Sequence, residues 1–368
     1  MRKKILFIGR GASNDSKLDG GEYGARRVQS MVEHTVGIYN VESIIIEKPK
    51  FMQRIKNMLL FQSYGHTKTI KSKIKSIDYD NVELVFFNGS VYGRYVKMIA
   101  KKGINVMIFY HNVEHNFYLD KFKATKKLSD LWMYLYIWYN EKLTTKYSKY
   151  RITLNQRDSN ELNKVYNKIA DLISPSSYDY IGVAEDEINN DDIKNQYLLF
   201  VGGNFFSNID GIKSFIEEAL PKIDMDLWVV GNCCKSLEKW VNEKEHPRVK
   251  LKGFVEDLTK IYKEASAVIC PIYSGSGMKT KTVEALKFGK YIFATKESFE
   301  GIDGDYNRIG ALCNNSEEFV KAINFWMQGN PSKYNEYSFN IFMNNYSNEI
   351  VFKRFKDFLI SCDITLGE

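Results

Sequence analysis

The sequence predicts an α/β protein with two domains, each built on a parallel sheet. A chain of 368 residues is long enough for two separate cores. Short apolar runs typical of buried strands alternate with helix-like segments, and this alternation favours parallel strands joined by helices. A polar, acidic stretch at residues 183–195 has the composition of an interdomain linker. We therefore expect a first domain at residues 1–186, a second at 187–345 and a terminal helix at 346–368.

The composition is that of an ordinary soluble globular protein, with 44% hydrophobic and 26% charged residues. The five cysteines include no C-x-x-C pair, which argues against a disulfide framework or a zinc site and fits a reducing cytosol. The basic N-terminus leads into a short apolar run without a cleavage site, so it predicts a first strand and not a signal peptide. No apolar run reaches the length of a bilayer span. These features predict a cytoplasmic protein.

The net charge of +7 is concentrated in the first half of the chain. Residues 1–190 hold 30 Lys and Arg against 20 Asp and Glu, which leaves 22 against 25 for the remainder. A basic surface favours an acidic partner, which could be nucleic acid, anionic lipid or a phosphorylated substrate. No recognisable nucleic-acid-binding module accompanies the charge, so we do not expect nucleic acid.

Residues 48–75 contain eight basic residues and no acidic one, with apolar residues interleaved at near-helical spacing. A basic amphipathic segment is typical of helices that lie on anionic lipid. The alternative is a surface helix that packs on its own domain. The candidate membrane or acceptor surface comprises Lys50, Arg54, Lys56, Lys68 and Lys71.

In the first half, apolar runs predict buried strands at residues 4–9, 82–87 and 106–110, with the last strand of the domain at 151–155. Residues 9–11 open a dinucleotide-binding fingerprint without its third glycine, so they are weak evidence for an NAD site.

Polar residues follow the strand at 106–110. His111 stands there beside Asn112 and Glu114, and open α/β sheets bind ligands outside the carboxyl ends of their strands. A functional role for His111 is therefore predicted, the alternative being a structural histidine. The aromatic segment at 131–139 is either an interfacial anchor or part of the core.

The second half alternates strands and helices regularly, at residues 197–202, 209–219, 227–231, 235–244, 249–253, 256–264, 267–271, 279–288 and 291–294. A glycine-rich loop at 274–278 feeds the helix at 279–288. Lys279 and Lys281 lie in its first turn, where a cation is disfavoured unless an anion lies nearby, so the pattern predicts a bound phosphate. Glu284 follows one turn after Lys281 and could bind ribose hydroxyls. The alternative is a solvated helix start with a Lys–Glu surface pair.

These residues resemble the donor-binding region of the GT-B glycosyltransferases, near the retaining family 4 or group 1 enzymes. The resemblance rests on Gly275–Lys279, Lys281, Glu284–Leu286, Gly289 and Glu300–Gly301, and it extends to residues 197–203, Asn208, 228–231 and 249–258. It implies two facing Rossmann-like domains with a donor cleft between them and a last helix that crosses back to the first domain. It further implies a catalytic role for His111 near the reacting sugar, and a donor site made of Gly21, Gly203, Asn204, Ser276, Gly277, Met278, Lys281 and Glu284.

The implied function is transfer of a hexosyl group from a nucleotide-sugar to a glycan or lipid-linked acceptor in surface polysaccharide biosynthesis. The protein would act in the cytoplasm, with peripheral attachment to the inner face of the cell membrane. No cofactor and no metal are expected, because none of three Asp-x-Asp triplets directly ends an apolar strand. These triplets begin at Asp78, Asp224 and Asp303.

The sequence departs from the family pattern in two regions. Ser276 stands where the family usually has a second glutamate, and Gly203, Asn204 and Asn208 follow a strand after which Arg and Lys are common. These departures leave open a non-catalytic GT-B subunit that stabilises or targets a partner transferase. A GT-B sugar epimerase is a third interpretation, but it would not require a basic membrane-facing strip.

Overall fold

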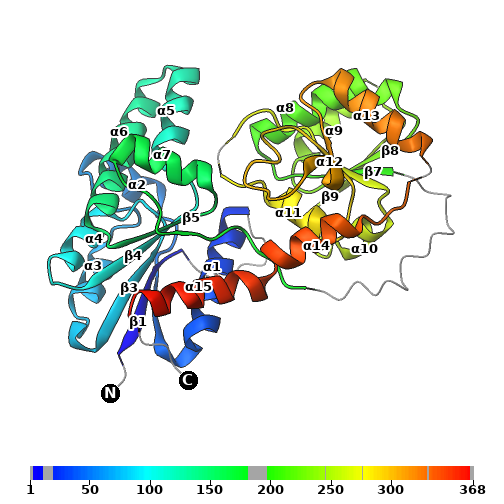
Figure 1. Ribbon diagram of the computed structural model, residues 1–368. Coiled ribbons are helices and arrows are strands. Elements are labelled where there is room, and N and C mark those ends of the chain that lie inside the picture. The colour runs from blue at the N-terminus through cyan, green and yellow to red at the C-terminus, as the bar shows by residue number, and fades with distance from the viewer. Residues whose placement is uncertain are drawn as a thin grey trace. The chain divides into compact units, whose positions relative to one another are not determined.

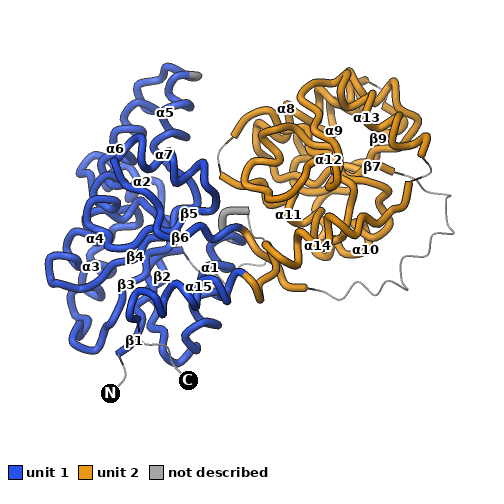
Figure 2. Tube along the Cα trace, viewed as in Figure 1, with its two compact units in different colours: residues 1–175, 351–368 blue, residues 176–350 orange. Residues whose placement is uncertain are grey.

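A computed structural model describes residues 3–10, 20–180, 197–244, 246–275, 277–329 and 331–364, apart from the side chains of residues 20–22 and 124. The chain divides into two compact units, Met1–Pro175 with Val351–Glu368 (unit 1) and Ser176–Ile350 (unit 2) (Figure 2). The division differs from the expected one at residues 176–180 and 346–350, which both belong to unit 2, where Tyr178 forms a β-bridge with Ser347. The expected boundary at residue 186 lies outside the described residues.

Unit 1 contains a six-stranded parallel sheet in the order β2-β1-β3-β4-β5-β6 (Figure 1). Its strands are β1 (Lys4–Gly9), β2 (Val41–Ile45), β3 (Val82–Asn88), β4 (Asn105–Tyr110), β5 (Tyr150–Thr153) and β6 (Leu172–Ile173). The expectation that the strand near residue 151 is the last of its domain was wrong. Strand β6 follows it, and two residues are too few to produce a periodic pattern.

Helices cover the sheet of unit 1. They are α1 (Gly20–Val36), α2 (Phe51–Leu59), α3 (Lys68–Lys75), α4 (Gly93–Ala100), α5 (Glu114–Thr125), α6 (Leu128–Tyr147) and α7 (Gln156–Tyr166), with short 3₁₀ turns at Ile38–Asn40 and Tyr79–Asn81. Alternate strand residues enter two separate cores, as the two-residue period of a strand requires. Leu6 and Ile8 pack in the core that includes α3, α4 and α7, whereas Ile5 and Phe7 pack in the other.

The last helix, α15 (Asn348–Ser361), completes this second core of unit 1. Its residues Val351, Phe352, Phe355 and Leu359 pack with α1 and with inward-facing strand residues. Phe355 meets Phe86 of β3 edge to face, with ring centroids 6.0 Å apart. The spacing of these four residues places them on one helix face, which explains why α15 covers the sheet.

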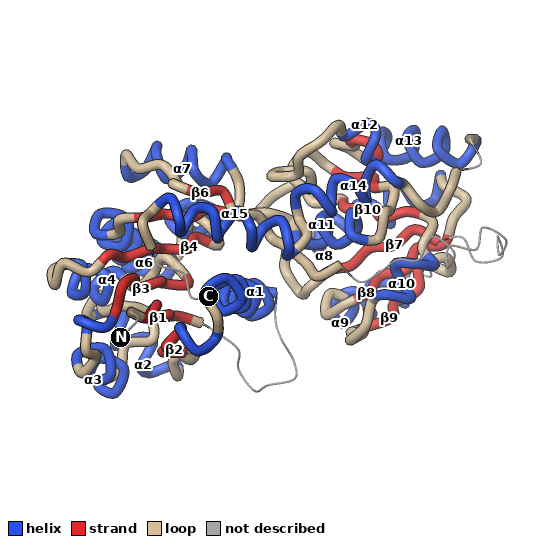
Figure 3. The backbone as a smooth tube through the Cα atoms, turned by 60° about the horizontal axis from the view of Figure 1, so that its bottom comes forward, coloured by secondary structure: helices blue, strands red, loops and turns tan. Residues whose placement is uncertain are grey.

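Unit 2 contains a second six-stranded parallel sheet, in the order β12-β11-β10-β7-β8-β9 (Figure 3). Its strands are β7 (Tyr197–Val201), β8 (Asp226–Val230), β9 (Val249–Gly253), β10 (Ala267–Cys270), β11 (Ile292–Ala294) and β12 (Gly310–Leu312). Its helices are α8 (Phe206–Ser214), which continues as a π-helical turn (Phe215–Ala219) and a 3₁₀ turn (Leu220–Lys222), then α9 (Cys234–Glu243), α10 (Thr259–Glu264), α11 (Thr280–Lys287), α12 (Tyr306–Ile309), α13 (Ser316–Gln328) and α14 (Glu336–Asn345).

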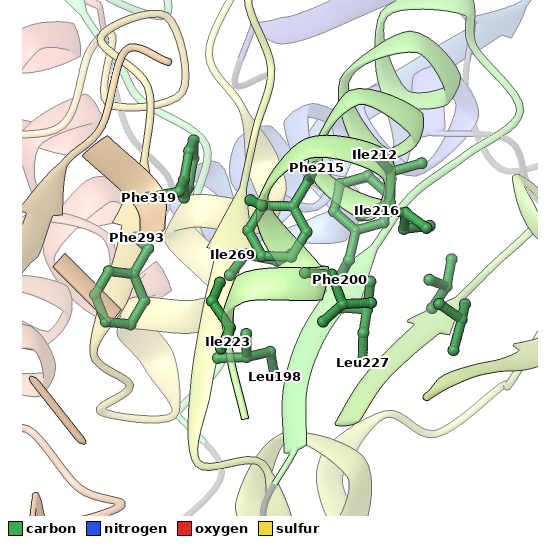
Figure 4. Close-up of a cluster of buried hydrophobic side chains, with 14 of the residues drawn as sticks. Leu198, Phe200, Ile212, Phe215, Ile216, Ile223, Leu227, Ile269, Phe293 and Phe319 are labelled. Carbon is green, nitrogen blue, oxygen red and sulfur yellow. The ribbon is translucent and has the colours of Figure 1, made fainter. Parts of the chain in front are cut away.

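One core of unit 2 joins the sheet to α8, α9 and α13 (Figure 4). Leu198 and Phe200 of β7 lie at its centre with Ile212 of α8 and Phe319 of α13, and all four are fully buried. Gly211 allows α8 to approach the sheet, since a Cβ atom there would lie 1.8 Å from the carbonyl oxygen of Pro271. Helix α8 is therefore held against the start of the loop that follows β10.

Candidate functional site

The strand orders place a switch point in each sheet, where the direction of strand addition reverses. In unit 2 this point lies between β7 and β10, and in unit 1 between β1 and β3. Ligands of open α/β sheets bind outside the carboxyl ends of the strands at such points. The loops that follow β7 and β10 contain most of the predicted donor residues.

Lys281 of α11 is held at the unit 2 switch point. Its Nζ atom donates a 2.6 Å hydrogen bond to Oδ1 of Asn208 and lies 4.6 Å from the centre of the Phe200 ring. The Nδ2 atom of Asn208 donates in turn to the carbonyl oxygen of Gly203, over 2.9 Å. Burial lowers the pKa of Lys281 to about 8. The amide oxygen of Asn208 and the ring of Phe200 carry no formal negative charge, so these two contacts do not neutralise the ammonium group. Such an environment favours an anionic ligand.

Glu284 follows Lys281 on the same helix and is half-buried. The hydroxyl group of Tyr262, on α10, donates to Oε2 of Glu284 over 3.0 Å. Tyr262 is fully buried and stacks on Phe288, with ring centroids 4.7 Å apart. The buried Tyr262 phenol thus fixes the position of the Glu284 carboxylate. The other carboxylate oxygen, Oε1, can also accept hydrogen bonds from hydroxyl groups.

The glycine-rich loop before α11 has the backbone that its sequence predicts. Gly275 and Gly277 have φ angles of 143° and 66°, which other residues rarely adopt. Met278 is buried. Lys279 forms a 2.6 Å ion pair with Glu297, which supplies an acidic partner for one of the two lysines at the helix start. Ser276 lies outside the described residues.

Gly203 and Asn204 follow β7 and are exposed. The carbonyl oxygen of Gly203 accepts from Asn208, and Oδ1 of Asn204 accepts from the hydroxyl of Ser236 over 2.8 Å. The structure therefore brings Gly203 into one network with Lys281, whereas Asn204 belongs to a contact with α9.

At the unit 1 switch point, His111 follows β4 and pairs with the last residue of β3. Its Nε2 atom lies 2.7 Å from Oδ1 of Asn88. Asn88 is buried, and its Nδ2 atom donates to the carbonyl oxygens of Arg10 and Ala25, over 2.8 and 3.0 Å. Burial, reinforced by the charges of Arg27 and Arg10, lowers the pKa of His111 to about 4. The ring is therefore neutral at physiological pH.

A fully buried carboxylate anchors the next turn of the chain. Glu141 of α6 accepts hydrogen bonds from the backbone N–H groups of Glu114 and His115, both over 3.0 Å, and from the hydroxyls of Ser90 and Tyr166, over 2.7 and 2.9 Å. It caps the N-terminus of α5, where a negative charge is favoured. Burial and then the charge of Glu141 raise the pKa of Glu114 to about 7. The Glu141 carboxylate therefore positions the segment that begins at His111.

Gly21 lies in the first turn of α1, in unit 1. The donor residues predicted for the second half of the chain lie in unit 2, and His111 lies in unit 1. Each unit thus carries its predicted polar residues at the carboxyl edge of its own sheet.

The predicted basic surface lies on α2 and α3 and in the residues just before α2. All five of its side chains are exposed, namely Lys50, Arg54, Lys56, Lys68 and Lys71. Phe51 and Met52 at the start of α2 are 75% and 73% exposed. In the aromatic segment of α6, Tyr136 and Ile137 are buried, so this part packs in the core, whereas Trp132 remains partly exposed. Across the described ranges, no helix combines the length and the apolar character that crossing a bilayer requires.

Carboxylates of all three Asp-x-Asp triplets take part in local structure. Asp78 accepts from the backbone N–H of Asp80, Asp305 accepts from that of Asn307, and Asp226 pairs with Lys250 over 2.6 Å. In the described part of the chain, no three His, Cys, Asp or Glu side chains gather as a metal site would require.

Residues 195–328 match the family described as Glycosyl transferases group 1. This segment is similar to the group 1 glycosyltransferases. The matched segment contains the loops that follow β7 and β10, with Gly203, and helix α11, with Lys281 and Glu284. The family resemblance seen in the sequence is confirmed over this range.

Solved structures extend the likeness from this segment to the fold of the whole chain. The sucrose-phosphate synthase of Thermosynechococcus elongatus is 12% identical with a TM-score of 0.73, over 98% of this chain and 99% of that one. Anabaena HepE, in complex with UDP and glucose, is 13% identical with a TM-score of 0.64, over 98% and 99%. The fold is therefore GT-B, as the sequence predicted. A protein in the cps region of Klebsiella pneumoniae is 26% identical over 176 residues, which are 44% of this chain and 45% of that relative, so less than half of each is matched.

Three residues of the two sites were not found from the sequence. Asn88 directly ends an apolar strand, and the rule that selected His111 could have selected it as well. Tyr262 and Glu141 lie inside helices, and only tertiary contacts reveal them. A buried glutamate next to an aromatic run has no local signal that distinguishes it from a surface residue.

Proposed function

We propose that the protein is a glycosyltransferase that moves a hexosyl group from a nucleotide-sugar to a glycan or lipid-linked acceptor, with retention of configuration. The observation that carries this proposal is the Lys281–Asn208–Gly203 network at the switch point of a group 1 glycosyltransferase domain. It presents a partly desolvated ammonium group where a diphosphate would bind, one helix turn from a carboxylate suited to ribose.

The chemistry requires stabilisation of the charge that develops on the departing diphosphate. Lys281 supplies a positive charge, and the N-terminus of α11 adds a helix dipole and backbone N–H groups. Lys281 would replace the Arg and Lys that the family often has after β7. The missing glutamate would be replaced by backbone N–H groups of the loop at 274–278, which includes Ser276, Gly277 and Met278. Gly21, Gly203 and Asn204 would line the donor site as the family resemblance implies. No metal ion is needed for this step.

Unit 2 would bind the nucleotide through Glu284 and Lys281, and the more basic unit 1 would take the acceptor. His111 would contact the sugar, since it is fixed at the unit 1 switch point by Asn88. Orientation of an acceptor hydroxyl toward the anomeric carbon is the remaining requirement of the reaction.

Surface polysaccharide biosynthesis is the process that we propose. The K. pneumoniae relative is a protein of the cps region, and the structurally similar HepE was solved with UDP and glucose. A UDP-linked sugar is therefore the first donor to test.

Peripheral attachment to an anionic membrane is the second part of the proposal. The exposed basic side chains of α2 and α3 lie beside Phe51 and Met52, whose apolar side chains are among the most exposed in unit 1. Positive charge combined with exposed apolar side chains is typical of helices that lie in a membrane interface. A lipid-linked acceptor would be reached at this surface, on the inner face of the cell membrane.

A panel of UDP-, GDP- and dTDP-sugars tests the donor assignment by thermal stabilisation, because a ligand that binds the native state raises the melting temperature. We expect one nucleotide to stabilise the wild-type protein and to stabilise Glu284→Gln less. A Glu243→Gln variant, altered at an exposed residue of α9, is the matched control. Absence of stabilisation by every member of the panel would overturn the donor site.

Ser276 favours one other function, a GT-B subunit that lacks catalysis and stabilises or targets a partner transferase. Hydrolysis of a nucleotide-sugar by the pure chain separates the two proposals. Slow release of free sugar, lost in Lys281→Ala, supports the enzyme, whereas tight nucleotide binding without any turnover supports the subunit.

A further inference from the structure

Asn88 constrains which nitrogen of His111 carries the proton. The Nδ2 atom of Asn88 lies 2.8 and 3.0 Å from two backbone carbonyl oxygens, those of Arg10 and Ala25. Both oxygens can only accept hydrogen bonds, so the amide group must direct its NH₂ toward them. The opposite orientation would place the Asn88 oxygen against two carbonyl oxygens in a buried site, without a donor. The Oδ1 atom of Asn88 therefore faces His111.

The partner of that oxygen must be a donor. Nε2 of His111 lies 2.7 Å from Oδ1 of Asn88, so Nε2 carries the proton. In a neutral imidazole only one nitrogen is protonated, so Nδ1 presents a lone pair. The charged groups that face the ring are Arg27 of α1 and Arg10 after β1, and both disfavour a second proton on it.

The Nδ1 edge of the ring is turned toward Gly24 of α1. A Cβ atom at Gly24 would lie 3.7 Å from Nδ1 and 3.8 Å from Cε1 of His111. The absence of a side chain on this helix residue leaves space beside the lone pair. In the described part of the chain, no hydrogen bond to this ring is found other than that with Asn88.

We propose that Asn88 is a positioning residue that holds His111 as the Nε2–H tautomer, so that Nδ1 accepts a hydrogen bond from a sugar hydroxyl. The hydroxyl part rests on the proposed function, whereas the tautomer does not. An unprotonated Nδ1 can accept a hydrogen bond from a sugar hydroxyl, but it cannot donate one to a phosphate oxygen. The chemical class of its ligand is thus a neutral hydroxyl donor.

Nitrogen-15 NMR of the histidine rings tests the tautomer in the free protein, with His111→Gln used to assign the signals. We expect a protonated Nε2 and an unprotonated Nδ1, unchanged between about pH 6 and pH 8. In Asn88→Ala, the loss of the amide acceptor should give a mixture of the two tautomers. A protonated Nδ1 in the wild type would overturn the proposal, as would an unaltered tautomer in a folded Asn88→Ala protein.

The ligand is tested by adding the nucleotide-sugar that stabilises the protein most, and separately its nucleoside diphosphate. The Nδ1 signal of His111 should move with the sugar-bearing compound and not with the diphosphate alone. Equal movement with both, or no movement with a bound nucleotide-sugar, would overturn the hydroxyl assignment. If no nucleotide binds at all, the proposed function fails and the hydroxyl assignment fails with it, while the tautomer result stands on its own.

Gly24→Ala provides a second variant that does not depend on the stability of Asn88 mutants. Alanine is a better helix former than glycine, so the melting temperature should not fall. The new methyl group would cover Nδ1, so the nucleotide-sugar should no longer move its signal, although the tautomer stays the same. Retention of the sugar-dependent shift in Gly24→Ala would contradict access along this edge.

Discussion

The ammonium group of Lys281 has an environment that makes its charge sensitive to pH. It lies against Phe200 and Asn208, and burial lowers its pKa to about 8. An arginine at this position would keep its charge at any accessible pH. The pH dependence of diphosphate affinity should therefore differ between a lysine and an arginine at this position.

Nucleoside diphosphate affinity should therefore be nearly constant from about pH 7, where the terminal phosphate is largely ionised, to about pH 8, and should fall above it by up to about tenfold per pH unit. The affinity falls with rising pH because the anion binds the protonated lysine, which becomes the minor form above its pKa. Calorimetric titration of the wild type across this range measures the effect.

Lys281→Arg is the control, and its affinity should stay flat over the same range. Lys281→Ala should weaken diphosphate binding far more than nucleoside binding. An equal loss for both ligands would identify Lys281 as a structural residue.

Glu284→Gln should leave the fold intact and weaken donor binding by about 1–3 kcal/mol, the scale of a hydrogen bond to a charged group. The glutamine keeps an oxygen for the Tyr262 hydroxyl but loses the carboxylate charge. Isothermal titration with the stabilising nucleotide-sugar gives the number. Unchanged affinity in the folded variant would refute the ribose assignment.

We also predict that transfer persists in excess EDTA, because Lys281 and the N-terminus of α11 can neutralise the diphosphate. The measurement is product formation before and after dialysis against the chelator. Activity that is lost in EDTA and restored by Mn²⁺ or Mg²⁺ would show that a metal ion, and not Lys281 with the α11 N-terminus, neutralises the diphosphate.

At the scale of elements, helix α5 depends on a residue that belongs to another helix. Glu141 of α6 accepts from two backbone N–H groups of the α5 N-terminus, as well as from Ser90 and Tyr166. Each carboxylate oxygen accepts two hydrogen bonds. Replacing either oxygen by another group would therefore leave two donors without their acceptor. A substitution of Glu141 should therefore displace the start of α5 together with the segment that begins at His111.

Glu141→Gln should lower the free energy of unfolding by about 1.5–3 kcal/mol, because an NH₂ group would replace an acceptor that two donors need. Tyr166→Phe removes a single donor and should cost only about 1 kcal/mol. Urea denaturation measures both, and hydrogen exchange at the Glu114 and His115 amides should accelerate in Glu141→Gln alone. Slow exchange at those amides in the glutamine variant would contradict the capping role.

Much of the fold is encoded in local patterns, but some elements are not. The strand at residues 4–9 and the alternation from β7 to β11 follow from apolar periodicity, and both were predicted. Strands β2 and β12 were missed because Val41–Ile45 is half exposed and Gly310–Leu312 has three residues. Lys281 and Glu284 could be selected from a motif, whereas Asn88 and Glu141 have roles that depend on residues far away in the chain.

At the scale of the whole molecule, unit 1 should attach the protein to anionic membrane. Reversal of Lys50, Arg54, Lys56 and Lys71 should release it from vesicles that contain phosphatidylglycerol, since each basic residue contributes about 1 kcal/mol near the surface. Added salt should have the same effect on the wild type. Vesicle co-sedimentation measures the bound fraction.

The matched control reverses four exposed lysines of unit 2, namely Lys235, Lys239, Lys260 and Lys321. It should remain bound. Equal release of both variants would point to net charge alone, and salt-insensitive binding would favour a helix that simply packs on its domain.

Helix α15 follows nearly all of unit 2 in the chain, yet from Val351 onward it belongs to unit 1 (Figure 2). Four of its side chains complete a core of unit 1. During synthesis on the ribosome, the segment that forms unit 2 is therefore finished while unit 1 still lacks part of its interior. Domains usually mature in the order in which they are made. Here the first domain to begin is the last to be completed, because the core between its sheet and α1 gains its remaining apolar side chains only when Val351–Leu359 emerges.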